Sequence, residues 1–210
     1  SLAALRGVKD FRMEVVVLSK QEYRQIARIH KEGIFKGFLS TLSLSFLALI
    51  YEAIDQSTIS ELVVVRAKGR IVGFIAGSQD IRDVYRIMLR SPVRLLTALL
   101  PAFVSPKTIF RIFETVMFSK KGGVLDFDLP SEELLSISVL PEFRGMGYAE
   151  ELFKSLVSEF RSRNIGCFKI VVGEALEPAH RFYKKMGARP IGNVTVHKGV
   201  GSIVYVFFVA

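Results

Sequence analysis

The sequence predicts an α/β fold in which helices surround a central sheet. Two apolar runs rich in β-branched residues, 61–67 and 70–77, flank Lys68-Gly69 and are typical of a β-hairpin. Apolar side chains recur at three- and four-residue spacing over 150–163, which is the pattern of an amphipathic helix. Half of the 210 residues are hydrophobic, so the chain can bury a sizeable core as a single domain over 1–210.

The N-terminal third is predicted to contain one strand and two helices. The valine-rich segment 13–18 is typical of a strand. Ser19 and Glu22 have the spacing of a capping box, which predicts a helix over 20–31. A second helix is indicated by four apolar residues that share one helical face: Leu42, Phe46, Leu49 and Ile50.

Residues 80–130 differ from the rest of the chain in charge and periodicity. Arginines recur every four residues from Arg82 to Arg94, interleaved with apolar positions. The stretch 80–123 holds eight basic against three acidic residues, a net charge of +5. Ser105-Pro106 has the form of a helix start. We interpret 80–130 as a basic helical insertion within the domain, although a solvated arginine face over a core-packing stripe explains the same pattern.

The C-terminal half is predicted to alternate strands and helices. A strand over 134–140 precedes the amphipathic helix, and another strand follows over 167–172. A short helix over 178–186 comes next, with proline at its start and glycine after its end. Two further strands, 194–197 and 203–209, form a closing hairpin around a turn that contains two glycines.

The turn between the 134–140 strand and the following helix carries the strongest functional signal. Residues 141–149 read Pro-Glu-Phe-Arg-Gly-Met-Gly-Tyr-Ala. Gly145 and Gly147 let the backbone approach a ligand closely, because no side chain stands in the way. The first amides of the helix lack intrahelical acceptors, and the helix dipole adds partial positive charge there. With the charge of Arg144, this turn is predicted to bind a pyrophosphate group.

The turn lacks the Lys-Ser/Thr pair of a P-loop and the longer glycine spacing of a dinucleotide fingerprint. Instead, residues 144–149 resemble the Arg/Gln-x-x-Gly-x-Gly/Ala signature of the GNAT N-acetyltransferase superfamily, and 138–143 are similar to its Val-x-Pro-x-aromatic lead-in. Residues 179–188 resemble a second family segment, Ala-x-x-Phe-Tyr-x-Lys-x-Gly-Phe. The resemblance covers 134–187 well and is absent from 80–130.

The resemblance implies a mostly antiparallel central sheet with splayed parallel strands, flanked by helices, and acetyl-CoA as a co-substrate bound where those strands part. The cofactor-binding residues that it implies are Ile137, Val139, Arg144, Gly145, Met146, Gly147, Tyr148, Ala149, Phe182 and Lys185. Leu176 replaces the family's usual Asn, which removes one expected contact with the cofactor, and Ala188 replaces the usual Phe. No metal is expected, because the histidines do not cluster with cysteines or carboxylates.

Tyr183 is the candidate general acid of the implied reaction, in which an amine attacks the thioester and the thiolate of CoA leaves. A phenol with an ordinary pKa near 10 can protonate a departing thiolate. A tyrosine that only packs beside Phe182 is the alternative.

Glu133 is the candidate general base, because family members often carry Glu early in the strand before the loop. A base is needed since a primary amine is almost fully protonated at pH 7. Leu135 stands at another position where the family often has the acid, and a solvated pair of Glu132 and Glu133 is an alternative interpretation. His197, near the predicted cleft, is a second candidate base or substrate ligand, with a surface histidine as the alternative.

The predicted function is therefore acyl-CoA N-acyltransfer, with acetyl-CoA as donor and a small-molecule primary amine as acceptor. The arginines of the insertion favour an aminosugar or another small phosphorylated metabolite. The alternatives are a protein or peptide amine, and a non-catalytic acyl-CoA-binding module.

Charge and cysteine content bear on partners and compartment. The net charge of +9 attracts polyanions. We nevertheless expect no nucleic acid partner, because no surface interleaves aromatic and basic residues. A peripheral contact with an anionic membrane surface is possible through residues 80–121. The single cysteine, Cys167, allows no intrachain disulfide. No signal peptide is evident in the sequence. The apolar stretch 42–51 is too short to span a membrane. A cytoplasmic location is the expectation.

Overall fold

The computed structural model describes residues 18–34, 42–99, 129–197 and 200–209, with the backbone alone at 195–197 and at Val200. Its elements in chain order are α1 (Lys20–Gly33), α2 (Leu44–Gln56), β1 (Ser60–Ala67), β2 (Arg70–Ser78), α3 (Ile81–Leu89), α4 (Pro92–Leu99), β3 (Glu133–Val139), η4 (Pro141–Phe143), α6 (Tyr148–Ser162), β4 (Cys167–Gly173), α7 (Glu177–Lys185), β5 (Arg189–His197) and β6 (Val200–Phe208). The predicted strand over 13–18, apart from Leu18, and the predicted helix start at Ser105-Pro106 lie outside the described residues.

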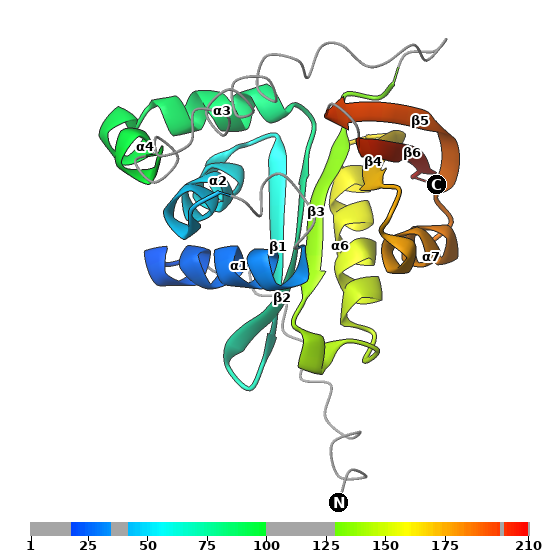
Figure 1. Ribbon diagram of the computed structural model, residues 1–210, viewed down its shortest axis with the longest axis horizontal. Helices are drawn as coiled ribbons and strands as arrows, with labels where there is room; N and C mark the ends of the chain where they lie inside the picture. The colour runs from blue at the N-terminus through cyan, green and yellow to red at the C-terminus, as the bar shows by residue number, and fades with distance from the viewer. Residues whose placement is uncertain (1–17, 35–41, 100–128, 198–199, 210) are drawn as a thin grey trace, which may run out of the picture.

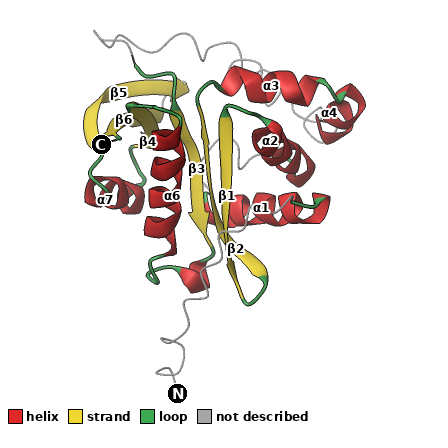
Figure 2. Ribbon diagram, turned by 180° about the vertical axis from the view of Figure 1, so that it is seen from behind, coloured by secondary structure: helices red, strands yellow, loops and turns green. Residues whose placement is uncertain are grey.

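The strands of the described residues form one six-stranded sheet with the order β1-β2-β3-β4-β6-β5. Neighbouring strands are antiparallel except β3 and β4, which are parallel. Helices α1 and α2 cover one face, with α3 and α4 beside α2, while α6 and α7 cover the other face (Figures 1 and 2). The predicted fold class, including its one parallel pair, is confirmed.

Local signals in the sequence explain most element boundaries. Ser19 and Glu22 form the predicted capping box at the start of α1. Lys68 and Gly69 both have positive φ angles and close the β1–β2 hairpin as a two-residue turn. The C-terminal hairpin differs from the prediction because β5 begins at Arg189 and continues through Pro190. β5 is an edge strand, where a residue without an amide donor is tolerated.

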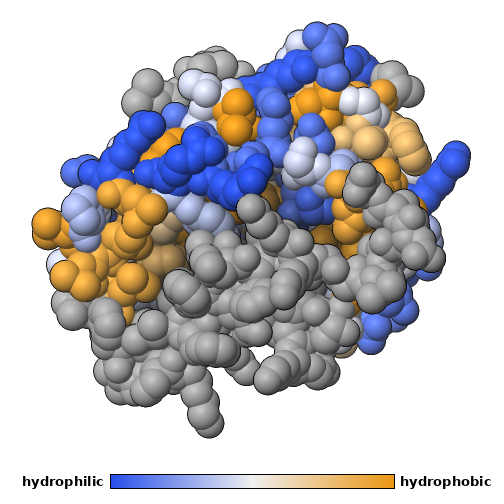
Figure 3. Space-filling model, turned by 90° about the horizontal axis from the view of Figure 1, so that it is seen from above, coloured by the Kyte–Doolittle hydropathy of each residue, from blue (hydrophilic) through white to orange (hydrophobic). Residues whose placement is uncertain are grey.

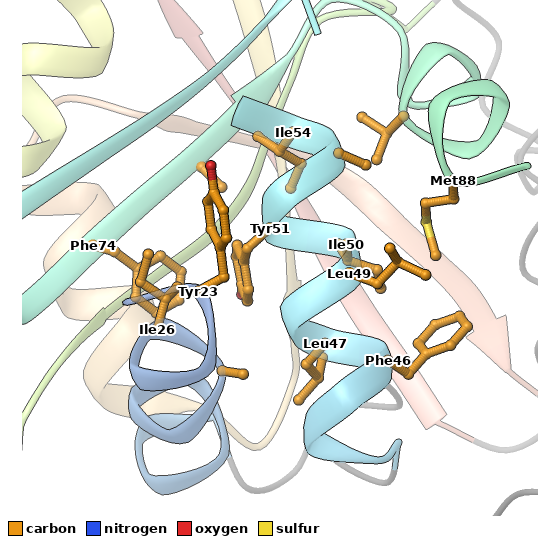
Figure 4. Close-up of a cluster of buried hydrophobic side chains, with 14 of the residues drawn as sticks. Tyr23, Ile26, Phe46, Leu47, Leu49, Ile50, Tyr51, Ile54, Phe74 and Met88 are labelled. Carbon is orange, nitrogen blue, oxygen red and sulfur yellow. The ribbon is translucent and has the colours of Figure 1, made fainter. Parts of the chain in front are cut away.

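The sheet separates two apolar clusters. The first lies between the sheet and α1, α2, α3 and α4, and Figure 4 shows part of it, with Ile26 on α1, Leu47 on α2 and Phe74 on β2 among its members. The predicted apolar face of α2 is confirmed, since Phe46, Leu49 and Ile50 are all buried in this cluster. The second cluster lies between the sheet and α6 and α7.

An irregularity in β3 positions the candidate site. Ala76 of β2 pairs with Ser136 and Gly77 pairs with Leu134, so Leu135 has no partner in the ladder and forms a bulge. On its other edge β3 pairs with β4 only at Glu133 and Leu134. Beyond Leu134 the two parallel strands separate, while β3 stays paired with β2 as far as Val139. At about 3.3 Å per residue, the stretch from Leu134 to Val139 is roughly 17 Å long.

One polar chain crosses the first cluster. His30 on α1 is 1% exposed, and its Nδ1 hydrogen-bonds the hydroxyl of Tyr51 on α2. The same hydroxyl hydrogen-bonds Oγ of Ser136 at 3.1 Å. Nε2 of His30 has no partner among the described residues. Burial, together with the charge of Lys31, lowers the pKa of His30 to about 4.

Acid is therefore expected to destabilise the fold through His30. The unfolded chain takes up a proton at this imidazole below its ordinary pKa of about 6.5, whereas the folded chain does so only near 4. The free energy of unfolding should therefore fall by about 3 kcal/mol in total as the pH drops from about 6.5 to about 4. Urea unfolding at pH 7 and pH 4 measures this loss, which should shrink in His30→Gln. An equal loss in the variant and the parent would contradict the assignment.

Candidate functional site

The loop between β3 and α6 holds two glycines in left-handed conformations, which favour glycine. The short 3-10 turn η4 ends at Phe143, and φ is +74° at Gly145 and +89° at Gly147. A Cβ atom at either glycine would meet no protein atom within 4 Å, so the space beside both is open. Gly147 is the N-cap of α6, and no side chain caps the helix there. With a left-handed glycine as the N-cap, the first main-chain amides of α6 are not covered by a capping side chain.

The main-chain amides of this loop are largely free to bind a ligand. The Arg144 amide is the exception, because it donates to the Pro141 carbonyl at 3.2 Å. The amides from Gly145 to Ala149 have no hydrogen-bond partner among the described residues. Converging amides at a helix N-terminus bind anions, and the helix dipole strengthens the attraction. The geometry of an anion cradle, predicted from the glycine spacing, is therefore present.

Two charged side chains at the loop are engaged within the protein. Nε of Arg144 donates to the Val139 carbonyl at 3.1 Å, so this guanidinium lies along the end of β3. Nζ of Lys185, at the end of α7, donates to the Glu150 carboxylate at 2.9 Å, and this bond lowers the pKa of Glu150. Lys185 thus offsets a carboxylate in the first turn of α6 that would otherwise repel an anion in the loop.

The separated strands extend the site from the loop into the sheet. Val139 is buried and Ile137 is half-buried, and both pack on the side of the sheet that carries α6 and α7. Beyond Leu134, no strand in the described part of the chain pairs with the β3 edge that faces β4. An elongated ligand bound at the loop has an open strand edge to follow toward Leu134.

Tyr183 lies on α7 within the second apolar cluster. Its ring is 5.3 Å from that of Phe182 and 6.4 Å from that of Phe153, measured between centroids. The side chain is 6% exposed, and its hydroxyl makes no hydrogen bond to any described residue. Burial raises the pKa of Tyr183, so the phenol keeps its proton at neutral pH. The raised pKa makes this phenol a weaker acid than the ordinary tyrosine assumed from the sequence, so its candidacy as proton donor rests on its protonated, uncommitted hydroxyl.

Glu133 stands where β3 and β4 are still paired, at the closed end of the separation. Its carboxylate is 3.6 Å from Nζ of Lys169, which also donates to the Pro130 carbonyl at 2.6 Å. Burial raises the pKa of Glu133, and the Lys169 ammonium opposes the rise. Burial also raises the pKa of Tyr85 to about 12, and the negative charge of Glu133 adds to that rise. A carboxylate with a raised pKa in such a position is a candidate base.

The sequence also offers Glu132 and His197 as possible bases, and it has Leu135 at another position where the family often carries the acid. Glu132 accepts a hydrogen bond from its neighbour Ser131 and has no ion pair among the described residues. Leu135, at the bulge, packs against the first cluster and so lies on the opposite face from Tyr183. The backbone of His197 ends β5, and its side chain is outside the described ones. Among the described residues, no three His, Cys, Asp or Glu side chains form a group that could hold a metal ion.

Sequence patterns did not reveal some partners of the site. Lys169 and Glu150 carry no motif, and their roles beside Glu133 and Lys185 appear only when the strands and helices are brought together. Leu176, where the resembling family has Asn, is the N-cap of α7 and makes no capping bond with its side chain. The helix start therefore lacks the side-chain acceptor that an Asn would supply.

The fold and the loop together define a mixed α/β domain with a glycine-containing turn of free amides at the open end of two parting parallel strands. Residues 111–188 match the model of the Acetyltransferase (GNAT) family. This match begins inside 80–130, where the sequence by itself showed no resemblance. A comparison with curated proteins finds no significant match.

Solved structures share the fold at low sequence identity. An N-acetyltransferase from Staphylococcus aureus Mu50 is 13% identical with a TM-score of 0.60, over 95% of this chain and 98% of that one. A proposed GNAT acetyltransferase from Desulfovibrio desulfuricans is 15% identical with a TM-score of 0.59, over 95% and 98%. The ribosomal-protein-S18-alanine N-acetyltransferase from Escherichia coli is 12% identical with a TM-score of 0.56, over 95% of both chains. The resemblance to the GNAT superfamily is thus confirmed, and these three likenesses support the fold alone.

Proposed function

We propose that this protein transfers an acetyl group from acetyl-CoA to a primary amine. The observation that carries the proposal is the set of unpartnered amides from Gly145 to Ala149 at the open end of the separated strands. A coenzyme with a diphosphate and a long flexible arm fits such a site, because the amides bind the diphosphate and the β3 edge accompanies the arm. The bound coenzyme supplies an activated thioester.

The side chains of the site are assigned to proton transfer and to the exclusion of water. Tyr183 holds a proton that its buried phenol can give to the departing thiolate. Glu133 takes the proton of the amine, directly or through water, from the closed end of the separation. Ile137, Val139 and Phe182 belong to the same apolar cluster as Tyr183 and keep water away from its phenol.

Glu133→Gln tests the assignment of the base. The variant should lower kcat/KM about 100-fold, because the amine loses its proton acceptor. In the parent, kcat/KM should fall as the pH drops through a Glu133 pKa above the ordinary 4.5, since only the carboxylate acts as a base. The variant should lose this acid limb. Glu132→Gln, one residue away, is the control and should leave both the rate and the pH profile unchanged. A parent-like profile in Glu133→Gln would remove Glu133 from the mechanism.

The acceptor is proposed only as a primary amine, with an aminosugar or small phosphorylated metabolite as the first class to test. Within 80–99, which forms α3 and α4, three of the four periodic arginines are already paired: Arg82 with Asp80, Arg86 with Asp83, and Arg94 with Glu52. Arg90 remains without an acidic partner among the described residues. The arginines of the Arg82 and Arg86 pairs are exposed, and such surface pairs are weak, so these two arginines can exchange their carboxylates for a phosphate, whereas Arg94 is held by Glu52.

Release of free thiol from acetyl-CoA, measured against a panel of aminosugars, phosphorylated amines and peptides, tests the proposed activity. Turnover with one class assigns the acceptor. Tight binding of acetyl-CoA without turnover on any amine would instead favour a non-catalytic acyl-CoA-binding module.

A peripheral contact with an anionic membrane through 80–121 stays a prediction. In its described part, Leu89, Val93 and Leu96 are 64%, 73% and 56% exposed. Figure 3 shows hydrophobic side chains gathered on the side where α3 and α4 lie, next to a hydrophilic band. No helix of the described residues is long and apolar enough to cross a membrane.

A further inference from the structure

A groove lies on the side of the molecule that carries α1, α2 and α4, across the sheet from α6 and α7 (Figures 1 and 2). Its volume is about 810 Å³. The buried side chains of Tyr23, Leu49 and Ala98 contribute to its lining, one from each of the three helices. None of the loop residues of the candidate acetyl-CoA site lines it. The groove is therefore a second concave surface, separate from the proposed active site.

Four cationic side chains line this groove. Arg94 on α4 is held by Glu52 on α2 through two hydrogen bonds, so it forms a fixed wall. Lys20, Arg24 and Arg28 on α1 are exposed and have no ion-pair partner among the described residues. Glu52 is the only acidic residue in the lining. The groove therefore carries a positive charge that the fold does not neutralise.

The placement of these cations does not serve the stability of α1. Lys20, Arg24 and Arg28 follow one another at intervals of four residues, where like charges repel. Lys20 lies in the first turn of the helix, where the macrodipole disfavours a cation. By contrast, Glu22 in the same turn is stabilised by the capping box and by Arg66. A row of unpaired cations on one side of a helix and inside a groove is an arrangement that a bound anion would relieve.

The spacing of the row indicates the form of the anion. Four helical residues rise about 6 Å, so the three cations lie along about 12 Å of the groove. Every second residue of an extended peptide points the same way and is separated by about 6.6–6.8 Å. Carboxylates at alternate positions would therefore meet successive cations. Tyr23, the aromatic residue of the lining, is buried and bonded to Asp55 rather than free to stack on a base, so the lining offers no stacking surface for a nucleic acid strand.

We propose that the α1–α2–α4 groove docks an extended acidic peptide segment, with alternate carboxylates on Lys20, Arg24 and Arg28. Arginine side chains suit this task because their planar guanidinium groups bind carboxylates bidentately. The inference is independent of the proposed acetyl transfer, because the groove shares no residue with the loop or with Tyr183 and Glu133.

Fluorescence anisotropy with the full chain and a labelled peptide of alternating Glu and Ser tests the docking. Arg24→Glu combined with Arg28→Glu should weaken binding by at least about tenfold, and the affinity of the parent should fall with added salt. Arg161→Glu, at an exposed arginine on α6 without an acidic partner among the described residues, makes the same kind of charge reversal once instead of twice, and it should change the affinity less than twofold, as expected for a distant charge. Acetyl-CoA affinity should be unchanged in both variants, which separates this test from that of the proposed function.

A second peptide of the same composition, with Glu-Glu and Ser-Ser in alternation, tests the spacing. The strictly alternating peptide should bind more tightly, because its carboxylates share one side. Equal affinity of the two peptides, an equal loss in Arg161→Glu, or stronger binding to single-stranded DNA or to phosphatidylserine vesicles than to the alternating peptide would each overturn the proposal. Unchanged binding in the Arg24 and Arg28 variant would overturn it as well.

Discussion

Replacing Gly147 with valine is expected to weaken acetyl-CoA binding by about 100-fold or more. A β-branched residue is strained at a φ of +89°, so the N-cap must move and the amides from Gly145 to Ala149 lose their common direction. Loss of two or more hydrogen bonds to a charged diphosphate corresponds to this factor. The new side chain would also enter the open space in which we place the ligand. Titration calorimetry with acetyl-CoA measures the effect.

Gly69→Val is the matched control for this substitution. Gly69 has a φ of +77° and open space around it, in the turn between β1 and β2 and away from the loop. It carries the same backbone strain without touching the anion cradle. Equal losses of affinity in the two variants would show that Gly147 acts through general stability and would remove the loop from the account.

Tyr183→Phe is expected to lower kcat by about 100-fold while KM for acetyl-CoA stays within about twofold. The substitution removes one hydroxyl that makes no hydrogen bond within the described residues, so packing against Phe153 and Phe182 is preserved. Only the proton for the leaving thiolate is lost. Steady-state kinetics at several pH values measures both parameters.

Tyr205→Phe is the control for the tyrosine. Its ring lies 6.3 Å from that of Tyr183, but its hydroxyl is bonded to Nδ1 of His180 at 2.9 Å. Nε2 of His180 is within reach of the Gly173 and Glu174 carbonyls, so this group links α7 to the end of β4. The variant should lower the melting temperature and leave kcat largely intact. A Tyr183→Phe enzyme with parent-like kcat would assign Tyr183 to packing alone.

The features predicted best were those encoded in short stretches of sequence. The capping box at Ser19 and the hairpin at Lys68-Gly69 depend on residues within a few positions of each other, and both are present. The loop conformation at Gly145 and Gly147 follows for the same reason, since a positive φ favours glycine. Local chemistry thus determines the conformation of the loop that we propose binds the diphosphate.

The features that could not be predicted depend on residues far apart in the sequence. The ion pair between Glu133 and Lys169 requires the register of the two parallel strands, and the bulge at Leu135 has no signal in the residues around it. Arg94 was interpreted as one of a row of available arginines, yet it pairs with Glu52, 42 positions earlier. The groove beside α1 needs three helices to form. These features depend on how distant segments pack together, and hydrophobic periodicity in the sequence does not predict such packing.

The most direct test of the account compares acetyl-CoA with S-acetylpantetheine, which has the same thioester and arm but no diphosphate. Acetyl-CoA should bind the purified protein tightly, and S-acetylpantetheine should bind at least about 100-fold more weakly. Gly147→Val should remove most of this difference in affinity. Absence of any affinity for acetyl-CoA, or equal affinity for the two ligands, would contradict the central claim that the amides of the β3–α6 loop bind the diphosphate.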